Sequence, residues 1–293
     1  MRKLLLHLDT SRLPSAFDQI VAYDAGADVV MAYGAVAEAD VRDLIHGCIF
    51  TRGLKELRNT ACFIGGADME AGQRLLKAAE KSFFGPFRVS LMLDSNGSNT
   101  TAVAAVEKIF EVVPDVGGKR AVVTAGTGPV GLRVAGLLVA AGAEVAITSR
   151  TEDHGEKSRV AIRDRFKGDV DVFAIHSPED LERALHGADI LCNCGPAGIQ
   201  LVPRRAWENR PTLRVVVDLN AVPPAGVEGI DPNDNGKTYG DIVAFGALGT
   251  GGLKMKIHKA SVAHLFTRND AVLDAESIAE LAHGLVRKSA ARA

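Results

Sequence analysis

The sequence predicts an α/β protein with two domains, the second of which contains a Rossmann-type parallel sheet. One observation is a strand–loop–helix–strand pattern over residues 119–150, where a β-branched segment runs into a glycine-rich loop and an Ala/Val/Leu-rich helix. A second is the alternation of strand and helix patterns through the first hundred residues, which is typical of a mostly parallel sheet covered by helices. A third is the length of 293 residues, which supports two such domains with buried cores.

The glycine-rich loop has the G-x-G-x-x-G spacing of dinucleotide-binding sites. It consists of Gly126, Thr127, Gly128, Pro129, Val130 and Gly131. In such loops the first glycine permits a tight turn, the second lets the backbone approach a pyrophosphate, and the third lets helix and strand pack closely. The amides at the start of the following helix then face an anion. Because the loop follows a predicted strand and precedes a predicted helix, we interpret these six residues as cofactor-binding.

The end of the next strand indicates which dinucleotide is bound. Sites for NAD usually place Asp or Glu there to hold the ribose 2′-hydroxyl, whereas this strand ends in Ser149 and Arg150. A hydroxyl and a guanidinium can bind a 2′-phosphate through charge-assisted hydrogen bonds. The pattern therefore favours NADP, with NAD as the second choice because Glu152 and Asp153 follow closely.

The remaining patterns divide the chain near residue 114. In the first part we predict strands over 3–8, 28–32, 60–64 and 88–93, and helices over 15–25, 38–46, 68–83 and 99–113. A Pro-Asp-Val-Gly-Gly break precedes the glycine-rich unit, whose later strands are predicted over 170–174, 190–194 and 214–218. We therefore expect an N-terminal α/β domain over 1–113 and a Rossmann domain over 114–264. The chain from 261 onward is predicted to be helical, with 265–293 packing back on the first domain.

Composition argues against several classes of function. The net charge is −2 with no long basic or acidic block, so nothing indicates a nucleic-acid or membrane partner. No apolar run approaches the roughly 20 residues that span a bilayer, and the apolar start is interrupted by Asp9, which favours a strand over a signal peptide. The four cysteines are Cys48, Cys62, Cys192 and Cys194. They lack the spacing of metal ligands, so we expect no bound metal. We expect their thiols to be free, as in a reducing cytoplasm.

Polar loops follow several predicted strands, where ligands collect in open α/β sheets. Residues 94–101 read Asp-Ser-Asn-Gly-Ser-Asn-Thr-Thr, eight consecutive small or hydrogen-bonding residues. One of them is expected to cap the next helix, but a cap does not need eight. We therefore interpret this loop as a ligand-binding segment, with a candidate substrate set of Asn96, Ser98, Asn99 and Thr100.

Three further loops carry candidate residues. Gly195, Pro196 and Ala197 follow a strand and are expected to pass near the nicotinamide half of the cofactor, and Asn220 follows another strand and could bond the nicotinamide amide or the substrate. For both loops, turn chemistry at a strand end is an equally open interpretation. In the third loop, 246–256, glycines can let the backbone approach a ligand. Lys254 stands at the start of the helix after it, where a solvated position is the alternative.

Several of these segments together resemble the NADP-dependent methylene-tetrahydromethanopterin dehydrogenases of one-carbon metabolism. The resemblance is carried by residues 94–101, 125–131, 229–231 and 245–254, and also by Asp9-Thr10, Phe17-Asp18 and residues 83–90. It extends over nearly the whole chain and is far more specific than a dinucleotide loop alone.

This resemblance implies a pterin-binding N-terminal domain, an NADP-binding second domain, an active-site cleft between them, and homo-oligomers that are trimers or multiples of trimers. It also implies that Lys254 lies in the active site and that Arg150 binds the adenosine 2′-phosphate. The chain departs from the family pattern at Thr250 and at Cys192-Asn193-Cys194. These departures leave the use of both NAD and NADP open.

The implied reaction moves a hydride from the methylene carbon between N5 and N10 of the reduced pterin to C4 of NADP⁺, which leaves a methenyl cation. No proton moves in that step, so catalysis rests on proximity and orientation. An ammonium disfavours a forming cation, so we expect Lys254 to orient the pterin through one of its oxygens or through a carboxylate such as Asp18. No tyrosine is followed four residues later by lysine, so the Y-x-x-x-K pair of dehydrogenase/cyclohydrolases is missing and no appreciable cyclohydrolase activity is expected.

Other functions stay open at this level. The same chemistry on a different carrier would make the protein a methylene-tetrahydrofolate dehydrogenase. A non-catalytic NADP(H)-sensing module is a second alternative, although the polar segment 94–101 argues against it because a sensor needs no second ligand. A reductase of another small carbonyl compound, such as a shikimate-like one, lacks a substrate-specific signature.

Overall fold

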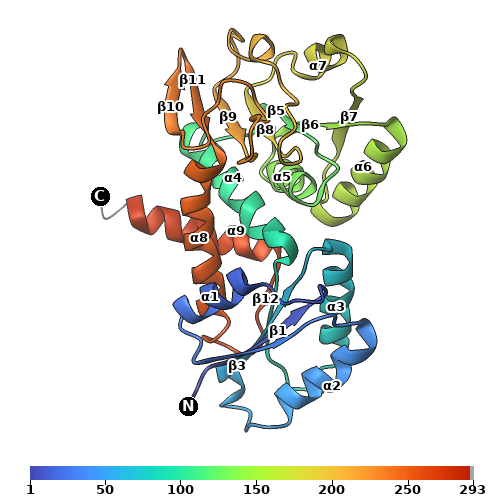
Figure 1. The fold of residues 1–293 in the computed structure, drawn as a ribbon, viewed down its shortest axis with the longest axis vertical. Helices are drawn as coiled ribbons and strands as arrows, with labels where there is room; N and C mark the ends of the chain where they lie inside the picture. The colour runs from blue at the N-terminus through green and yellow to red at the C-terminus, as the bar shows by residue number, and fades with distance from the viewer. Residues whose placement is uncertain (291–293) are drawn as a thin grey trace. The chain divides into compact units, whose positions relative to one another are not determined.

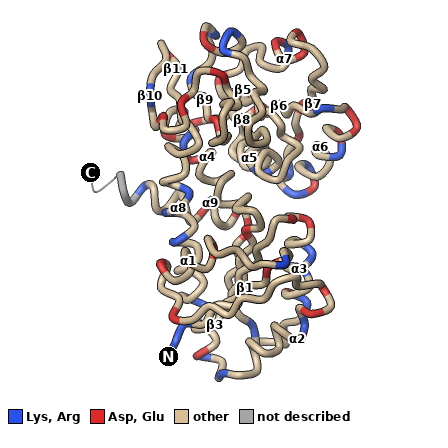
Figure 2. The backbone as a smooth tube through the Cα atoms, in the orientation of Figure 1, with Lys and Arg blue, Asp and Glu red and all other residues tan. Residues whose placement is uncertain are grey.

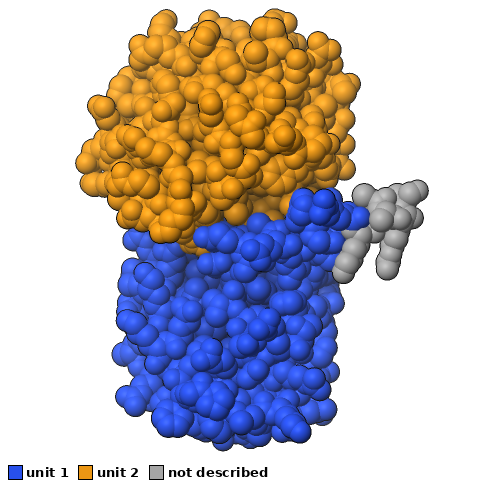
Figure 3. Space-filling model, turned by 180° about the vertical axis from the view of Figure 1, so that it is seen from behind, with its two compact units in different colours: residues 1–100, 255–293 blue, residues 101–254 orange. Residues whose placement is uncertain are grey.

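The chain forms two compact units in the computed structural model, which describes residues 1–290, with side chains to residue 287. One unit is made of residues 1–100 with the C-terminal segment from Met255, and the other of Thr101–Lys254 (Figure 3). The division lies inside two helices, α4 (Ser98–Val112) and α8 (Ala247–His264), and not at the expected boundaries 113/114 and 264/265. A helical pattern does not reveal which core each of its turns packs against, so sequence reasoning placed the boundaries at helix ends.

The first unit is built on a five-stranded parallel sheet (Figure 1). Its strands are β1 (Leu4–Asp9), β2 (Val29–Tyr33), β3 (Thr60–Gly65), β4 (Ser90–Leu93) and β12 (Val272–Leu273), in the order β12-β4-β3-β1-β2. In chain order this is the doubly wound arrangement 2-1-3-4-5, which changes direction between β1 and β3. Ligands of such sheets bind outside the carboxyl ends of the strands at that point.

Helices cover both faces of this sheet. On one face, α2 (Glu38–Ile49) and α3 (Met69–Lys81) pack over a core of buried aliphatic side chains, among them Leu8, Ile45 and Leu75. The other face carries His7 and Phe63, and it meets α8 through His258. The helices α1 (Ala16–Asp24) and α9 (Ala275–Ala290) complete the unit.

The second unit contains a seven-stranded sheet. Its strands are β5 (Arg120–Thr124), β6 (Glu144–Ser149), β7 (Val170–Ala174), β8 (Ile190–Asn193), β9 (Val215–Asp218), β10 (Asn235–Tyr239) and β11 (Ile242–Phe245), in the order β10-β11-β9-β8-β5-β6-β7. Strand β10 is antiparallel to β11, and the other pairings are parallel. When the antiparallel β10 is left out of the count, the order from β7 to β11 is 3-2-1-4-5-6, the Rossmann arrangement with its change of direction between β5 and β8. The predicted fold class is confirmed.

Three further helices belong to the second unit: α5 (Pro129–Ala140), α6 (Glu152–Phe166) and α7 (Pro178–Ala184). A Cβ added at Gly136 of α5 would lie 2.2 Å from the ring of Phe166 in α6, so glycine permits these helices to pack closely. Trp207 is fully buried, and its indole N–H donates to the carbonyl of Glu228 at 3.0 Å. Basic and acidic side chains are interspersed along both units (Figure 2). Within residues 1–290, no helix is long and apolar enough to cross a bilayer.

A predicted loop and a predicted helical region have a different structure from the one expected. Residues 247–256 are not a loop, because α8 already begins at Ala247. An added Cβ at Gly246 would lie 2.1 Å from the carbonyl oxygen of Asp231, and one at Gly249 would lie 2.0 Å from that of Asp234. These two glycines therefore let the start of α8 approach the protein's own backbone. The region after residue 261 is not continuously helical either, since β12 pairs with β4 before α9 begins.

Candidate functional site

The glycine-rich loop joins β5 to α5 as predicted, and its three glycines face different surroundings. A Cβ at Gly126 would lie 2.6 Å from the Cβ of Ile147, and one at Gly131 would lie 2.6 Å from the carbonyl oxygen of Ala125. These two positions are closed by the protein itself. At Gly128 the nearest atom to an added Cβ is 3.6 Å away, which is ordinary contact. Space in front of the helix is therefore left open at the second glycine, where a pyrophosphate would approach.

The start of α5 offers hydrogen-bond donors to such a ligand. Gly128 is the N-cap residue, no side chain caps the helix, and Pro129 occupies the first turn. The first amides of a helix have no partner within it, so those of Val130 and Gly131 can donate to a ligand at the start of α5. Thr127 is half-buried in the same loop. This arrangement suits an anion, because the positive end of the helix dipole lies at the same place.

The end of β6 lies beside this loop. Thr148 accepts a hydrogen bond from the amide of Ala125 at 3.1 Å through its hydroxyl oxygen, which ties the strand to the loop. Ser149 is buried, and Arg150 is exposed. Among residues 1–287, Arg150 makes no ion pair, whereas Asp153 pairs with Lys157 at 2.7 Å. The guanidinium thus remains available at the strand end, while one of the two nearby carboxylates is already neutralised.

A buried polar network lies where the strand order of the second sheet changes direction. The sequence analysis did not predict it. Asn193, at the end of β8, accepts from the hydroxyl of Thr124 at 2.6 Å and donates to the carboxylate of Asp218 at 2.7 Å. Asp218 in turn accepts from the amide of Val227 at 2.9 Å. All three polar side chains are at the carboxyl ends of apolar strands, and that position was the signal available in the sequence. The network fixes the strand ends beside the glycine-rich loop.

The two loops that follow β8 and β9 are held together by Asn220. Its side-chain oxygen accepts from the amides of Gly198 at 3.2 Å and Val222 at 2.9 Å, and its amide group donates to the carbonyl of Pro224 at 3.0 Å. Asn220 is 3% exposed. These hydrogen bonds stabilise turns at the strand ends, which is the role that the sequence analysis gave as the alternative to cofactor contact. Gly195, Pro196 and Ala197 lie in the first of the two loops, after the end of β8.

Two cysteines lie at the end of β8. The sulfurs of Cys192 and Cys194 are 3.8 Å apart, and both thiols are free. Contact with Cys194 and burial raise the pKa of Cys192 well above its usual value, so this thiol is protonated at neutral pH. Among residues 1–290 no cluster of His, Cys, Asp or Glu side chains is arranged to hold a metal ion.

In the first unit, the polar segment 94–101 uses much of its hydrogen bonding internally. The buried Asp94 carboxylate accepts from the amides of Asn99 at 2.8 Å and Thr100 at 3.0 Å, and from the Thr100 hydroxyl at 2.6 Å. The Asn99 side chain donates to the carbonyl of Leu93. Asn99 and Thr100 thus hold the start of α4. Asn96 is exposed with φ +54°, and the buried hydroxyl of Ser98 has no partner in the described part of the chain, so these two keep polar groups for a ligand.

Replacing Asp94 by asparagine is expected to destabilise the protein by about 1–2 kcal/mol, because an NH₂ group then faces a donor and a charge-assisted cap is lost. Urea unfolding of the variant measures this. Asp68→Asn is the matched control, since Asp68 caps α3 through Ala71 at the surface, where asparagine caps equally well. Equal losses in both variants would contradict the structural role of Asp94.

Several of these polar groups lie near one another at the carboxyl ends of β1, β3 and β4, where the strand order of the first sheet changes direction. Asp9 at the end of β1 accepts from the amides of Ser11 at 2.7 Å and Ser15 at 3.0 Å. The amide of Asn96 donates to the carbonyl of Gly66, just after β3, at 2.7 Å. The amide of Ala67 donates to the hydroxyl of Ser11 at 3.1 Å, so the loops after β1, β3 and β4 meet at the carboxyl edge of the sheet, where ligands are expected.

Asp18 lies in the first turn of α1, which Ser15 caps. Its carboxylate is 4.0 Å from Nε2 of the buried His258, whose ring stacks on Phe63 with centroids 5.6 Å apart. Lys254 precedes His258 by four residues in α8, so both project from the same side of that helix. His258 was not among the predicted site residues, because a single histidine without a partner at metal-ligand spacing gave no signal.

A second histidine lies behind this group. The rings of His7 and Phe63 pack edge to face with their centroids 5.2 Å apart, and Nε2 of His7 is 3.3 Å from the Asp9 carboxylate. Burial lowers the pKa of His7, although Asp9 opposes the shift. His7 is therefore a neutral part of the core beneath the loops.

Comparisons with known proteins identify the family. The chain is 49% identical over 284 residues to the "Bifunctional protein MdtA" of Methylorubrum extorquens, covering 96% of this chain and 98% of that protein. It is 33% identical over 264 residues to the NAD(P)-dependent methylenetetrahydromethanopterin dehydrogenase of the same organism, covering 87% of this chain and 89% of that protein. The chain belongs to the methylenetetrahydromethanopterin dehydrogenase family.

A family model adds to this assignment, and solved structures agree with the fold. The model described as methylene-tetrahydromethanopterin dehydrogenase, N-terminal, matches residues 16–96. Quinate dehydrogenase from Corynebacterium glutamicum, in complex with NAD, is similar with a TM-score of 0.53 and 14% identity over 96% of this chain and 98% of that one. Shikimate 5-dehydrogenase from Listeria monocytogenes gives a TM-score of 0.51, also at 14% identity, over 96% of both chains. The chain therefore shares its overall fold with these two dehydrogenases.

Proposed function

We propose that this chain is an NAD(P)-dependent dehydrogenase that transfers a hydride from 5,10-methylene-tetrahydromethanopterin to NADP⁺ and yields the methenyl form. The observation that carries the proposal is the similarity, over 87% of the chain, to a protein named as an NAD(P)-dependent methylenetetrahydromethanopterin dehydrogenase. The open Rossmann loop at Gly128 supports it independently, because that loop suits a dinucleotide.

The cofactor would be held along the carboxyl edge of the second sheet. The loop Gly126–Gly131 would face the pyrophosphate through the uncapped amides of α5. Arg150, with Ser149 beside it, would bind the adenosine 2′-phosphate. The loop with Gly195, Pro196 and Ala197 would line the nicotinamide half, and Asn220 would keep that loop in place. Bound NADP⁺ supplies the hydride acceptor.

The reduced pterin would lie at the carboxyl edge of the first sheet. Asn96, Ser98 and Asp18 offer polar groups there, while Asn99 and Thr100 maintain the loop that presents them. A carboxylate such as Asp18 can accept hydrogen bonds from N–H groups of a pterin. Positioning of this kind is the main catalytic demand, because hydride transfer requires orientation and no proton movement.

Lys254 would orient the pterin rather than take part in chemistry. We expect Lys254→Ala to lower turnover or pterin affinity about tenfold, because a hydrogen bond from a charged group is lost, and to leave NADP⁺ affinity unchanged. Steady-state kinetics with varied pterin measure this, with the exposed Lys256→Ala as control. Unchanged turnover and unchanged pterin affinity would remove Lys254 from the site.

Hydride transfer measured against two pterins and two nicotinamide cofactors tests the function itself. The fastest rate is expected with methylene-tetrahydromethanopterin and NADP⁺, with methenyl product accumulating because no Y-x-x-x-K pair is present for its hydrolysis. Faster turnover of methylene-tetrahydrofolate would favour the folate dehydrogenase instead. Tight NADPH binding without turnover of either pterin would favour a sensing module.

The assembly and compartment are also part of the proposal. We expect a cytoplasmic homo-oligomer, a trimer or hexamer, without nucleic-acid or membrane partners. The balanced charge of the chain supports the expected lack of a nucleic-acid partner, since it offers no basic block for polyanions. Light scattering of the purified protein measures the subunit number.

A further inference from the structure

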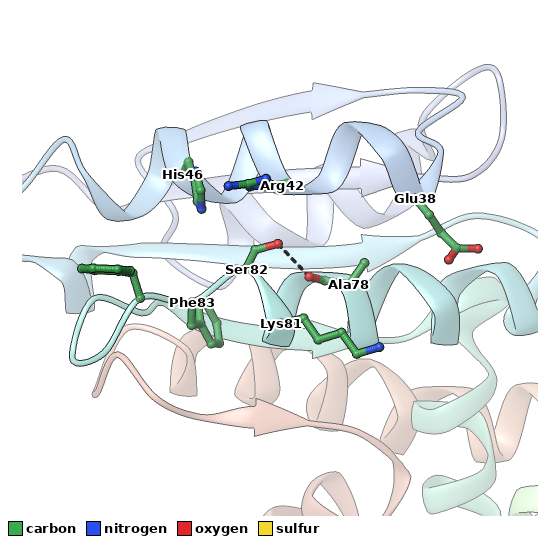
Figure 4. Close-up of a pocket in the computed structure, with 8 residues that line it drawn as sticks. Glu38, Arg42, His46, Ala78, Lys81, Ser82 and Phe83 are labelled. Atoms are coloured by element: carbon green, nitrogen blue, oxygen red, sulfur yellow. Dashed lines mark hydrogen bonds between the residues drawn. The ribbon is translucent and has the colours of Figure 1, made fainter.

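A groove of about 460 Å³ lies between α2 and α3 of the first unit, and its lining runs from Glu38 at the start of α2 to Phe83 and Phe84 after α3 (Figure 4). Arg42 and His46 line it from α2, and Lys81, Phe83 and Phe84 line it from the end of α3 and the segment that follows. Helices that connect parallel strands run back toward the amino edge of the sheet. The ends of α2 and α3 therefore lie at the opposite edge from the loops after β1, β3 and β4. The volume is in the range of small-molecule sites.

The groove has an excess of positive charge. Its acidic residue, Glu38, accepts from the guanidinium of Arg74 at 2.9 Å, so that charge is already paired. The side chains of Arg42 and Lys81 make no hydrogen bond or ion pair with any residue in the range 1–287. The Ser82 hydroxyl is committed as a donor to the carbonyl of Ala78 at 2.8 Å. An anion in the groove would thus be held by Arg42 and Lys81.

Aromatic rings stand at one end of the groove. Phe84 is 66% exposed, and its ring centroid is 6.2 Å from that of Phe50, which is itself 55% exposed. Phe83 lies deeper, with the guanidinium of Arg88 5.6 Å from its ring centroid. Exposed large aromatic residues gathered beside unpaired cations are the pattern of a recognition surface.

We propose that this groove binds a small molecule that combines a planar ring with an anionic group, either a phosphate or a carboxylate. The Arg42 guanidinium matches either anion with two parallel donors, and Lys81 adds a second positive charge from the facing helix. The ring of the ligand stacks on Phe84. This site goes beyond the proposed dehydrogenase function and does not depend on it.

An NMR titration that follows the amide signals of α2 and α3 tests the proposal. The probes are phenyl phosphate, benzoate, inorganic phosphate and benzyl alcohol, added without pterin or nicotinamide cofactor. Phenyl phosphate or benzoate is expected to bind in the millimolar range, as suits a ligand of this size, and at least about fivefold more tightly than inorganic phosphate or benzyl alcohol. Whichever of phenyl phosphate and benzoate binds more tightly shows whether the groove recognises a phosphate or a carboxylate.

Variants assign the binding to the groove. The double variant Arg42→Gln/Lys81→Gln is expected to lose at least about fivefold in affinity for the ring anions, and Phe84→Ala is expected to reduce that affinity to the level of inorganic phosphate. Lys77→Gln, on the same helix but outside the groove, is expected to change nothing. Equal binding of inorganic phosphate and phenyl phosphate, or undiminished binding by the double variant, would overturn the proposal. Dehydrogenase rates of these variants are expected to equal that of the unchanged protein, so failure here and failure of the proposed function are separate results.

Discussion

Replacing Gly128 by aspartate is expected to leave the protein at least as stable and to weaken NADP⁺ binding about 100-fold or more. Gly128 is the N-cap of α5, its φ of −77° suits any residue, and an added Cβ meets nothing closer than 3.6 Å. Aspartate is among the best N-cap residues and complements the helix dipole. The same carboxylate would occupy the place where the pyrophosphate approaches, and two negative charges about 4 Å apart repel by about 4 kcal/mol near a protein surface.

Two measurements decide this prediction, and two variants control it. Thermal unfolding without cofactor reports the stability, and calorimetric titration with NADP⁺ reports the affinity. Gly128→Asn caps the helix without a charge, so it is expected to retain stability and to lose less affinity than the aspartate variant. Gly131→Ala is expected to lose stability instead, because its Cβ would lie 2.6 Å from the Ala125 carbonyl oxygen. Full NADP⁺ affinity in Gly128→Asp would show that the cofactor does not approach this loop.

The elements that the sequence predicted correctly are those marked by a local pattern of apolar and capping residues. The strand predicted over 60–64 is β3 (Thr60–Gly65), and the helix predicted over 38–46 begins at Glu38 as α2 does. Buried parallel strands are continuous apolar runs, and capping residues such as Ser15 mark where helices begin. The glycine-rich loop was recognisable because its strand and helix surround it in the sequence.

What the sequence did not reveal depends on contacts between distant residues. The hairpin of β10 and β11 escaped prediction because Asn235–Tyr239 is polar and largely exposed, without an apolar alternation. The network of Thr124, Asn193 and Asp218 joins residues 69 and 25 positions apart. His258 acquires its surroundings only when α8 packs on Phe63 of β3.

The polar segment 94–101 has a structural role besides the binding role predicted for it. Eight polar residues exceed what one cap requires, but a buried Asp94 needs several donors, and Asn99 and Thr100 supply them. Burial of a carboxylate is costly unless it is hydrogen-bonded, so a tightly bonded loop is what this position demands. Sequence alone could not separate those residues from Asn96, which stays exposed.

Replacing Arg150 by glutamine is expected to reduce the preference for NADP⁺ over NAD⁺ by about 10- to 100-fold. Hydrogen bonds to charged groups contribute about 1.5–3 kcal/mol, and this one exists only with the cofactor that carries a 2′-phosphate. Arg150 is exposed at the end of β6 and forms no ion pair within the described side chains, so no internal contact is lost with it.

The ratio of kcat/KM for the two cofactors measures the effect, because a general loss of folding or turnover cancels in that ratio. The NADP⁺ value is expected to fall while the NAD⁺ value stays nearly constant. Arg205→Gln is the matched control, since Arg205 is another exposed arginine of the same unit, without an ion pair among the described residues and away from the strand end. A parallel fall of both values would mean that Arg150 serves the loop rather than the phosphate, and Glu152 would then become the residue to test for contact with the ribose.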